Sequence, residues 1–218
     1  MSPGDFPTAT PFLPARLTIP KLKAAASKCK GLISGRVQPK TVFGEGSSRA
    51  RIMLIGEQPG DKEDIAGHPF VGPAGRILDE ALTAAGITRR DVYLTNAVKH
   101  FSWTPAERGK RRIHKKPRYS EIRACRPWLE AEIAVTRPRV IACLAATAAQ
   151  TLLGSGFSVM RQRGQFVPSS LAPRVMATVH PSSILGAPDE RSLQEQKAAF
   201  IRDLAIIARE IKHFASAA

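Results

Sequence analysis

Cysteine and long apolar runs are both scarce in this sequence. Its 218 residues contain three cysteines, an odd number spread from Cys29 to Cys143, which excludes a disulfide-stapled secreted domain and predicts a reducing compartment. No uninterrupted apolar run reaches the roughly eighteen residues of a membrane span, and the N-terminus lacks the charged start and apolar block of a secretory signal. We therefore expect a cytoplasmic protein with no membrane partner.

Acidic side chains are few as well. Asp and Glu total 18 against 33 Lys and Arg, which gives a net charge of +15. Such an excess is typical of proteins that bind a phosphate backbone, although solubility alone would also account for it. The cations gather between residues 108 and 118, where the sequence places Arg108, Lys110, Arg111, Arg112, Lys115, Lys116 and Arg118. This cluster predicts a loop that contacts phosphates.

Short apolar runs alternate with segments of helical periodicity along most of the chain. The pattern predicts strands at 51–56, 91–97, 139–144 and 174–179 with a short extra strand near 165–167, and helices at 73–86, 119–136, 145–154 and 189–214. This alternation predicts a three-layer α/β/α fold around a central, mainly parallel four-stranded sheet. Residues 1–20 hold five prolines and are expected to form a loosely held arm, and residues 21–218 a single domain.

Three polar segments follow the expected strands. GEQPGD (56–61) follows the first strand, Asn96 ends the second, and HPSS (180–183) follows the last. Each alone is compatible with an ordinary turn, but ligands of such sheets bind beyond the carboxyl ends of the strands, where these segments converge. A small-molecule hydrolase is disfavoured because the chain lacks a Gly-x-Ser-x-Gly nucleophile turn. The sequence therefore predicts one site at this edge.

Five segments together carry a family resemblance. GEQPGD, PFVGPAGR, TNAVKH, ACRPWL and HPSS, in this order and at these separations, resemble the family 4 uracil-DNA glycosylases, and the insertion GKRRIHK (109–115) resembles that of the UdgX type. The resemblance extends from about Cys29 to the last helix. It implies a monomeric DNA-repair enzyme that acts on uracil in single-stranded or duplex DNA, without a nucleotide cofactor.

Cleavage of the bond between uracil and deoxyribose makes the sugar C1′ positive and the departing base negative. A catalyst therefore needs an anion near the sugar and hydrogen-bond donors near the base, and Glu57 and His180 suit these two roles. The resemblance implies that His180 donates to uracil O2, that Asn96 reads the uracil edge and that Phe70 stacks on its ring. It further implies base contacts from Gln58 and Asp61, and DNA contacts from Lys110, Arg111, Arg112, Lys115 and Ser182.

His114 lies within the basic insertion. Composition alone favours a solvated histidine in a DNA-contacting loop. The resemblance implies instead that His114 attacks C1′ after uracil leaves and remains covalently bonded to the DNA. Two alternatives stay open: an enzyme that releases free abasic DNA, and a DNA-binding module without activity. The second is disfavoured by Glu57, Asn96 and His180, because phosphate binding alone does not need them.

The resemblance also implies a [4Fe-4S] cluster. Cys29, His100 and Cys125 match three of the four ligand positions, but Leu32 stands where the second cysteine of an N-terminal Cys-x-x-Cys pair is expected, and leucine cannot bind iron. A three-ligand site could hold a cluster with one open iron, hold a three-iron cluster, or have lost its metal. Simple burial of the cysteines is the remaining possibility.

Overall fold

The computed structural model describes residues 7–29, 40–105 and 112–216. Its strands are β1 (Ile52–Gly56), β2 (Val92–Asn96), β3 (Trp103–Pro105), β4 (Arg112–His114), β5 (Val140–Leu144), β6 (Phe166–Val167) and β7 (Arg174–Thr178). Its helices are η1 (Thr10–Phe12), α1 (Ile19–Ala26), α2 (Asp61–Ala66), α3 (Pro73–Ala84), η2 (Arg89–Asp91), α4 (Tyr119–Thr136), α5 (Ala146–Leu153), α6 (Val159–Gln162), α7 (Pro181–Leu185) and α8 (Glu190–Ser216). None of the helices in these ranges is long and apolar enough to cross a membrane.

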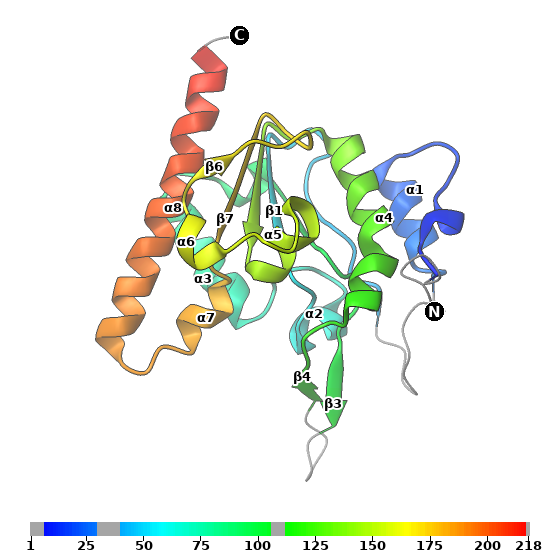
Figure 1. The fold of residues 1–218 in the computed structure, drawn as a ribbon, viewed down its shortest axis with the longest axis horizontal. Coiled ribbons are helices and arrows are strands. Elements are labelled where there is room, and N and C mark those ends of the chain that lie inside the picture. Colours follow the sequence, from blue (N-terminus) through cyan, green and yellow to red (C-terminus); the bar gives the residue numbers. More distant parts are fainter. Residues whose placement is uncertain (1–6, 30–39, 106–111, 217–218) are drawn as a thin grey trace.

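The central sheet confirms the expected fold. Its strand order is β2-β1-β5-β7-β6, and β2, β1, β5 and β7 run parallel (Figure 1). The sheet has five strands instead of the expected four, because the short strand expected near 165–167 joins it as β6, antiparallel to β7. The parallel strands bring their carboxyl ends to one edge of the sheet.

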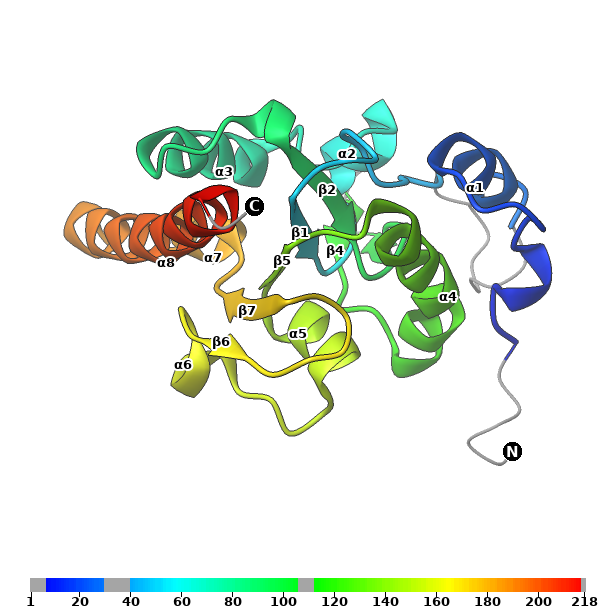
Figure 2. The ribbon, with the colours of Figure 1, turned by 90° about the horizontal axis from the view of Figure 1, so that it is seen from above.

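Helices cover both faces of the sheet (Figure 2). Ile52 and Leu54 of β1 belong to the core under α3 and α8, whereas Met53 and Ile55 belong to the core under α4 and α5. This alternation follows from the two-residue period of a strand. Helix α1 packs on the outer side of α4, where Leu22 shares a smaller apolar cluster with Trp128.

The described part of the N-terminal arm is more ordered than expected. Ala9 is fully buried, and its N–H donates to the Ala124 carbonyl of α4 at 2.9 Å. Helix α1 then begins within the expected arm, where Thr18 caps the helix and Pro20 occupies its first turn. Proline is well accommodated in a first turn, so this proline begins a helix here.

The basic segment is not simply a loop. Its residues 112–114 form β4, which pairs antiparallel with β3 so that Trp103 stands opposite His114. This hairpin projects from the molecule near α2, at the carboxyl edge of the sheet (Figure 1). Lys110 and Arg111, two of the expected DNA contacts, lie outside the described residues.

Both outer strands of the sheet, β2 and β6, leave few backbone hydrogen-bonding groups unpaired. The backbone of Leu94 in β2 exchanges two hydrogen bonds of 2.8 Å with Glu45, which lies in an antiparallel bridge beyond the strand. At the opposite side of the sheet, β6 is two residues long.

Candidate active site

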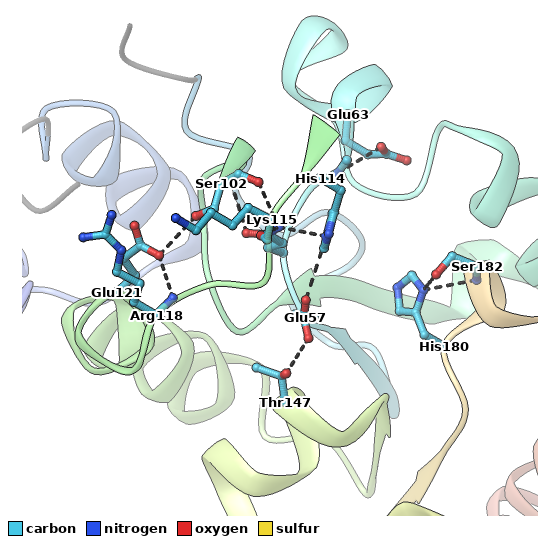
Figure 3. A network of polar contacts seen from close by, with 12 residues as sticks. Glu57, Glu63, Ser102, His114, Lys115, Arg118, Glu121, Thr147, His180 and Ser182 are labelled. Carbon is cyan, nitrogen blue, oxygen red and sulfur yellow. Dashed lines mark hydrogen bonds and ion pairs between the residues drawn. The ribbon is translucent and has the colours of Figure 1, made fainter. Parts of the chain in front are cut away.

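A cavity of about 490 Å³ opens at the carboxyl edge of the sheet. It is lined by Gln58, Pro59, Gly60, Asp61, Lys62, Glu63, Phe70, Pro73, Ala74, Asn96, His114, His180, Ser182 and Leu185. These residues come from the segment after β1, the start of α3, the end of β2, the hairpin and the segment after β7, so the three predicted segments do converge. Glu57 does not line this cavity but contacts His114 (Figure 3).

Two glycines allow Asn96 and Phe70 to reach the cavity. A Cβ atom at Gly56 would lie 2.3 Å from Oδ1 of Asn96 and 2.8 Å from Cζ of Phe70. A Cβ atom at Gly75 would lie 1.9 Å from the carbonyl oxygen of Phe70, whose φ of 55° is left-handed. Because both residues are almost fully buried, their side chains are held in one position.

The Asn96 amide is available for a ligand. It makes no hydrogen bond within the described ranges, although Asn96 is only 3% exposed. Its amide atoms are not enclosed, because Nδ1 of His100 is the one enclosed side-chain polar atom without a partner in the described part of the chain, so a ligand or water in the cavity can reach them. The amide can both donate and accept, which matches the adjacent N–H and carbonyl of uracil.

The hydrogen bonds of His180 fix its tautomer. The Ser182 N–H donates to Nδ1 of His180 at 3.1 Å, and the Ser182 hydroxyl lies 2.7 Å from the same atom (Figure 3). Burial lowers the pKa of His180 to about 4, with a smaller electrostatic contribution from the neighbouring His114. The ring is therefore neutral near pH 7, with its proton on Nε2, and it can offer an N–H donor to the cavity.

Gln58 holds His114 in the cavity wall. The orientation of the Gln58 amide is set by backbone groups: Ser102 N–H donates to its oxygen at 3.1 Å, and its nitrogen donates to the Lys115 carbonyl at 2.8 Å. The same nitrogen lies 2.8 Å from Nε2 of His114, so Nε2 accepts this bond and carries a lone pair. The His114 side chain is nevertheless 53% exposed.

Glu57 lies behind His114. One of its carboxylate oxygens is 3.8 Å from Nε2 of His114, and the other accepts a hydrogen bond from the Thr147 hydroxyl (Figure 3). The carboxylate is only 18% exposed. A carboxylate is thereby held next to Nε2 of His114, outside the set of residues that line the cavity.

Arg112 contacts carboxylates where the sequence suggested phosphates. Its Nε lies 2.5 Å from Asp61, and its Nη1 is paired with Asp64. The guanidinium also lies over the rings of Phe101 and Trp103, at 5.3 and 5.6 Å. Arg112 therefore fastens the hairpin to α2, and the Asp61 carboxylate is engaged in this contact although the residue lines the cavity.

Cys29, His100 and Cys125 are all buried, as expected for ligands or for core residues. Burial raises the pKa of Cys125 to about 11, and Nδ1 of His100 is buried without a hydrogen-bond partner in the described part of the chain. Within that part, no three His, Cys, Asp or Glu side chains are placed to hold a metal ion, and Leu32 falls outside it. The described residues therefore do not bring together the donors that a metal centre requires.

A buried ion pair beneath the site was not predicted. Lys99 and Glu132 are both fully buried, and Nζ of Lys99 lies 2.5 Å from the carboxylate. Lys99 also donates to the Asn96 carbonyl at 2.8 Å, and Glu132 accepts from the hydroxyls of Tyr93 and Thr95. The only signal in the sequence is that Glu132 occupies the apolar face of its helix.

Comparisons with known proteins agree with this geometry. A family model described as the uracil DNA glycosylase superfamily matches residues 43–205. The chain is 32% identical over 197 residues to the type-4 uracil-DNA glycosylase of Sulfurisphaera tokodaii, covering 87% of this chain and 86% of that protein. It is 39% identical over 145 residues to the type-4 uracil-DNA glycosylase of Thermotoga maritima, covering 66% and 71%. The chain therefore belongs to the uracil-DNA glycosylase superfamily.

Proposed function

We propose that this chain is a uracil-DNA glycosylase of the UdgX type, which removes uracil from DNA and then bonds His114 to C1′ of the abasic sugar. One observation carries the proposal: a neutral donor on His180, an unpartnered amide on Asn96 and a lone pair on His114 border a single cavity. The relatives named above are type-4 uracil-DNA glycosylases, which supports the first half of the reaction.

In the first step the bond between uracil and C1′ breaks, and its electron pair leaves with the base. Nε2–H of His180 donates to the carbonyl oxygen on which the negative charge develops, and Asn96 holds the uracil edge. The Glu57 carboxylate stabilises the positive charge at C1′. The uracil must leave the base stack to reach this cavity.

In the second step Nε2 of His114 gives its lone pair to C1′ and forms the N–C bond. The imidazole becomes positive and releases its Nδ1 proton to solvent, while the uracil anion takes up a proton from solvent. The lone pair that attacks is the one that now accepts from Gln58, so this hydrogen bond must break as the new bond forms. Gln58 thus holds the nucleophile in place until a sugar arrives.

The proposal is tested by incubating the protein with a uracil-containing oligonucleotide and separating the products on a denaturing gel. We expect a slow band resistant to heat and detergent, with about one uracil released per protein molecule. His114→Ser should abolish this band while uracil is still released. His180→Ala should slow release by about a hundredfold, since it removes one charge-stabilising donor.

Free abasic DNA with many uracils released per protein would instead establish the turnover glycosylase, in which His114 only contacts DNA. A slow band retained by His114→Ser would assign the bond to another residue. Absence of any release would contradict the glycosylase itself. The [4Fe-4S] cluster stays a prediction of the resemblance, which iron analysis of protein purified without oxygen would check.

A further inference from the structure

Tyr119 exposes an aromatic ring in a strongly basic setting. It is the first residue of α4 and is 71% exposed. Three exposed cations precede it, Lys115, Lys116 and Arg118, and the Arg123 guanidinium lies 6.0 Å from its ring centroid. An aromatic face among cations is a recurrent means by which proteins bind single-stranded nucleic acids.

A continuous chain of hydrogen bonds joins the start of α4 to His114 (Figure 3). Gln58 lies 2.8 Å from Nε2 of His114 and accepts from the Ser102 N–H. The Ser102 hydroxyl donates to Glu121 at 3.2 Å, and Glu121 accepts from the Arg118 N–H at 2.7 Å. The backbone next to Tyr119 is therefore held in a fixed place relative to the cavity.

Tyr119 also lies at the same edge of the sheet as the cavity. Helix α4 begins beside the hairpin, at the carboxyl edge of the sheet, and runs away from it (Figure 1). Tyr119 follows His114 by five residues, so the two Cα atoms are at most about 18 Å apart. A DNA strand whose uracil occupies the cavity can place a nucleotide over the ring within a few steps.

We propose that Tyr119 is a stacking platform for an unpaired base close to the uracil, so that this site binds single-stranded DNA in preference to duplex. The inference rests on the proposed function, because it takes DNA as the ligand of the cavity. In a duplex, the bases beside the extruded uracil stay paired and stacked, and they offer no free face to Tyr119. In a single strand the faces are free, and the neighbouring cations hold the phosphates.

The test measures binding to DNA that cannot react. The probe is a fluorescently labelled single strand with one 2′-fluoro-2′-deoxyuridine, whose fluorine disfavours positive charge at C1′ and so blocks cleavage; the same strand in duplex form is the comparison. We expect Tyr119→Ala to weaken single-strand binding about tenfold and duplex binding by less than twofold. Tyr119→Phe, which keeps the ring, should bind as the unmodified protein does.

Met160→Ala is the matched control, because Met160 is 82% exposed on α6 and belongs to neither the cavity nor the basic segment. Thermal unfolding should be unchanged in all three variants. Single-strand binding unaffected by Tyr119→Ala, or an equal loss for single strand and duplex, would overturn the proposal. A separate assay with ordinary deoxyuridine reports uracil release, so failure of the glycosylase would be seen independently of stacking.

Discussion

At the scale of single residues, the site depends on the absence of a side chain at Gly56. Its hydrogen atom faces Oδ1 of Asn96 and the ring of Phe70, where a methyl group would overlap both. We expect Gly56→Ala to displace the Asn96 amide and to slow uracil release by about a hundredfold, the scale of a misplacement near 1 Å. Single-turnover release from a uracil-containing strand measures the effect.

Gly156→Ala is the matched control for this substitution, since a Cβ atom there meets nothing within 4 Å. It should leave uracil release unchanged. Release by Gly56→Ala at the unmodified rate would show that Asn96 and Phe70 tolerate displacement, and would argue against a reading role for the Asn96 amide.

At the scale of elements, the hairpin of β3 and β4 is fastened by Arg112. Its guanidinium joins the hairpin to Asp61 and Asp64 of α2, and Asp64 is almost completely buried. We expect Arg112→Gln to loosen the hairpin, so that His114 on β4 is held less firmly at the cavity. The amount of covalent product per uracil released should then fall about tenfold. Arg112→Lys should restore little of the covalent product, since an ammonium group cannot bridge Asp61 and Asp64 as the planar guanidinium does.

Hydrogen exchange of the β4 amides provides a readout that does not depend on the covalent step, and it should quicken in Arg112→Gln. Arg126→Gln is the control, because Arg126 forms an exposed pair with Glu130 on α4. Unchanged exchange and unchanged product in Arg112→Gln would remove Arg112 from any role in positioning His114.

The helices and strands also show how much of the fold could be predicted from the sequence. The helix expected at 119–136 is α4 residue for residue, and the four long strands agree to within a residue, because sustained periodicity and dense apolar runs are local signals. Helices α2 and α7 were not predicted, since five or six residues are too few to establish a period. The pairing of Trp103 with His114 was missed because antiparallel pairing across a hairpin depends on contacts that local patterns do not contain.

The features of the site also divide into those that the sequence predicted and those that it did not. Gln58, Asn96 and His180 were predicted from segments that follow strands, since the topology alone brings such segments together. Phe70 and His114 were expected at the site only from the family resemblance. The partners of Arg112 were not predicted, because Asp61 and Asp64 lie about fifty positions earlier and their proximity depends on the docking of the hairpin. Charge and the family resemblance suggested a DNA contact for Arg112, which stays a prediction, whereas only the fold places two carboxylates beside this residue.

At the scale of the whole molecule, a net charge of +15 predicts DNA binding that weakens steeply with salt. For single strands the logarithm of the binding constant should fall by about 0.7 per phosphate contact for each unit of log salt concentration. We expect Lys115→Gln with Lys116→Gln to lower this slope by about 1.4. Titrations of a labelled strand at several salt concentrations measure it.

The control is Arg137→Gln with Arg139→Gln, which removes the same charge from a groove of about 900 Å³ at the amino end of β5. That groove lies at the opposite edge of the sheet from the cavity, so the slope should stay unchanged. Equal reductions from both pairs would mean that DNA binding is spread over the whole surface and is not concentrated at the cavity.

The two outer strands of the sheet, β2 and β6, influence whether the protein aggregates in concentrated solution. An unpaired outer strand attracts the strands of other molecules and begins aggregates. Here Glu45 already occupies backbone groups of β2, and β6 offers only two residues. We therefore expect the folded protein to resist edge-to-edge aggregation, which allows it to be stored and handled at high concentration.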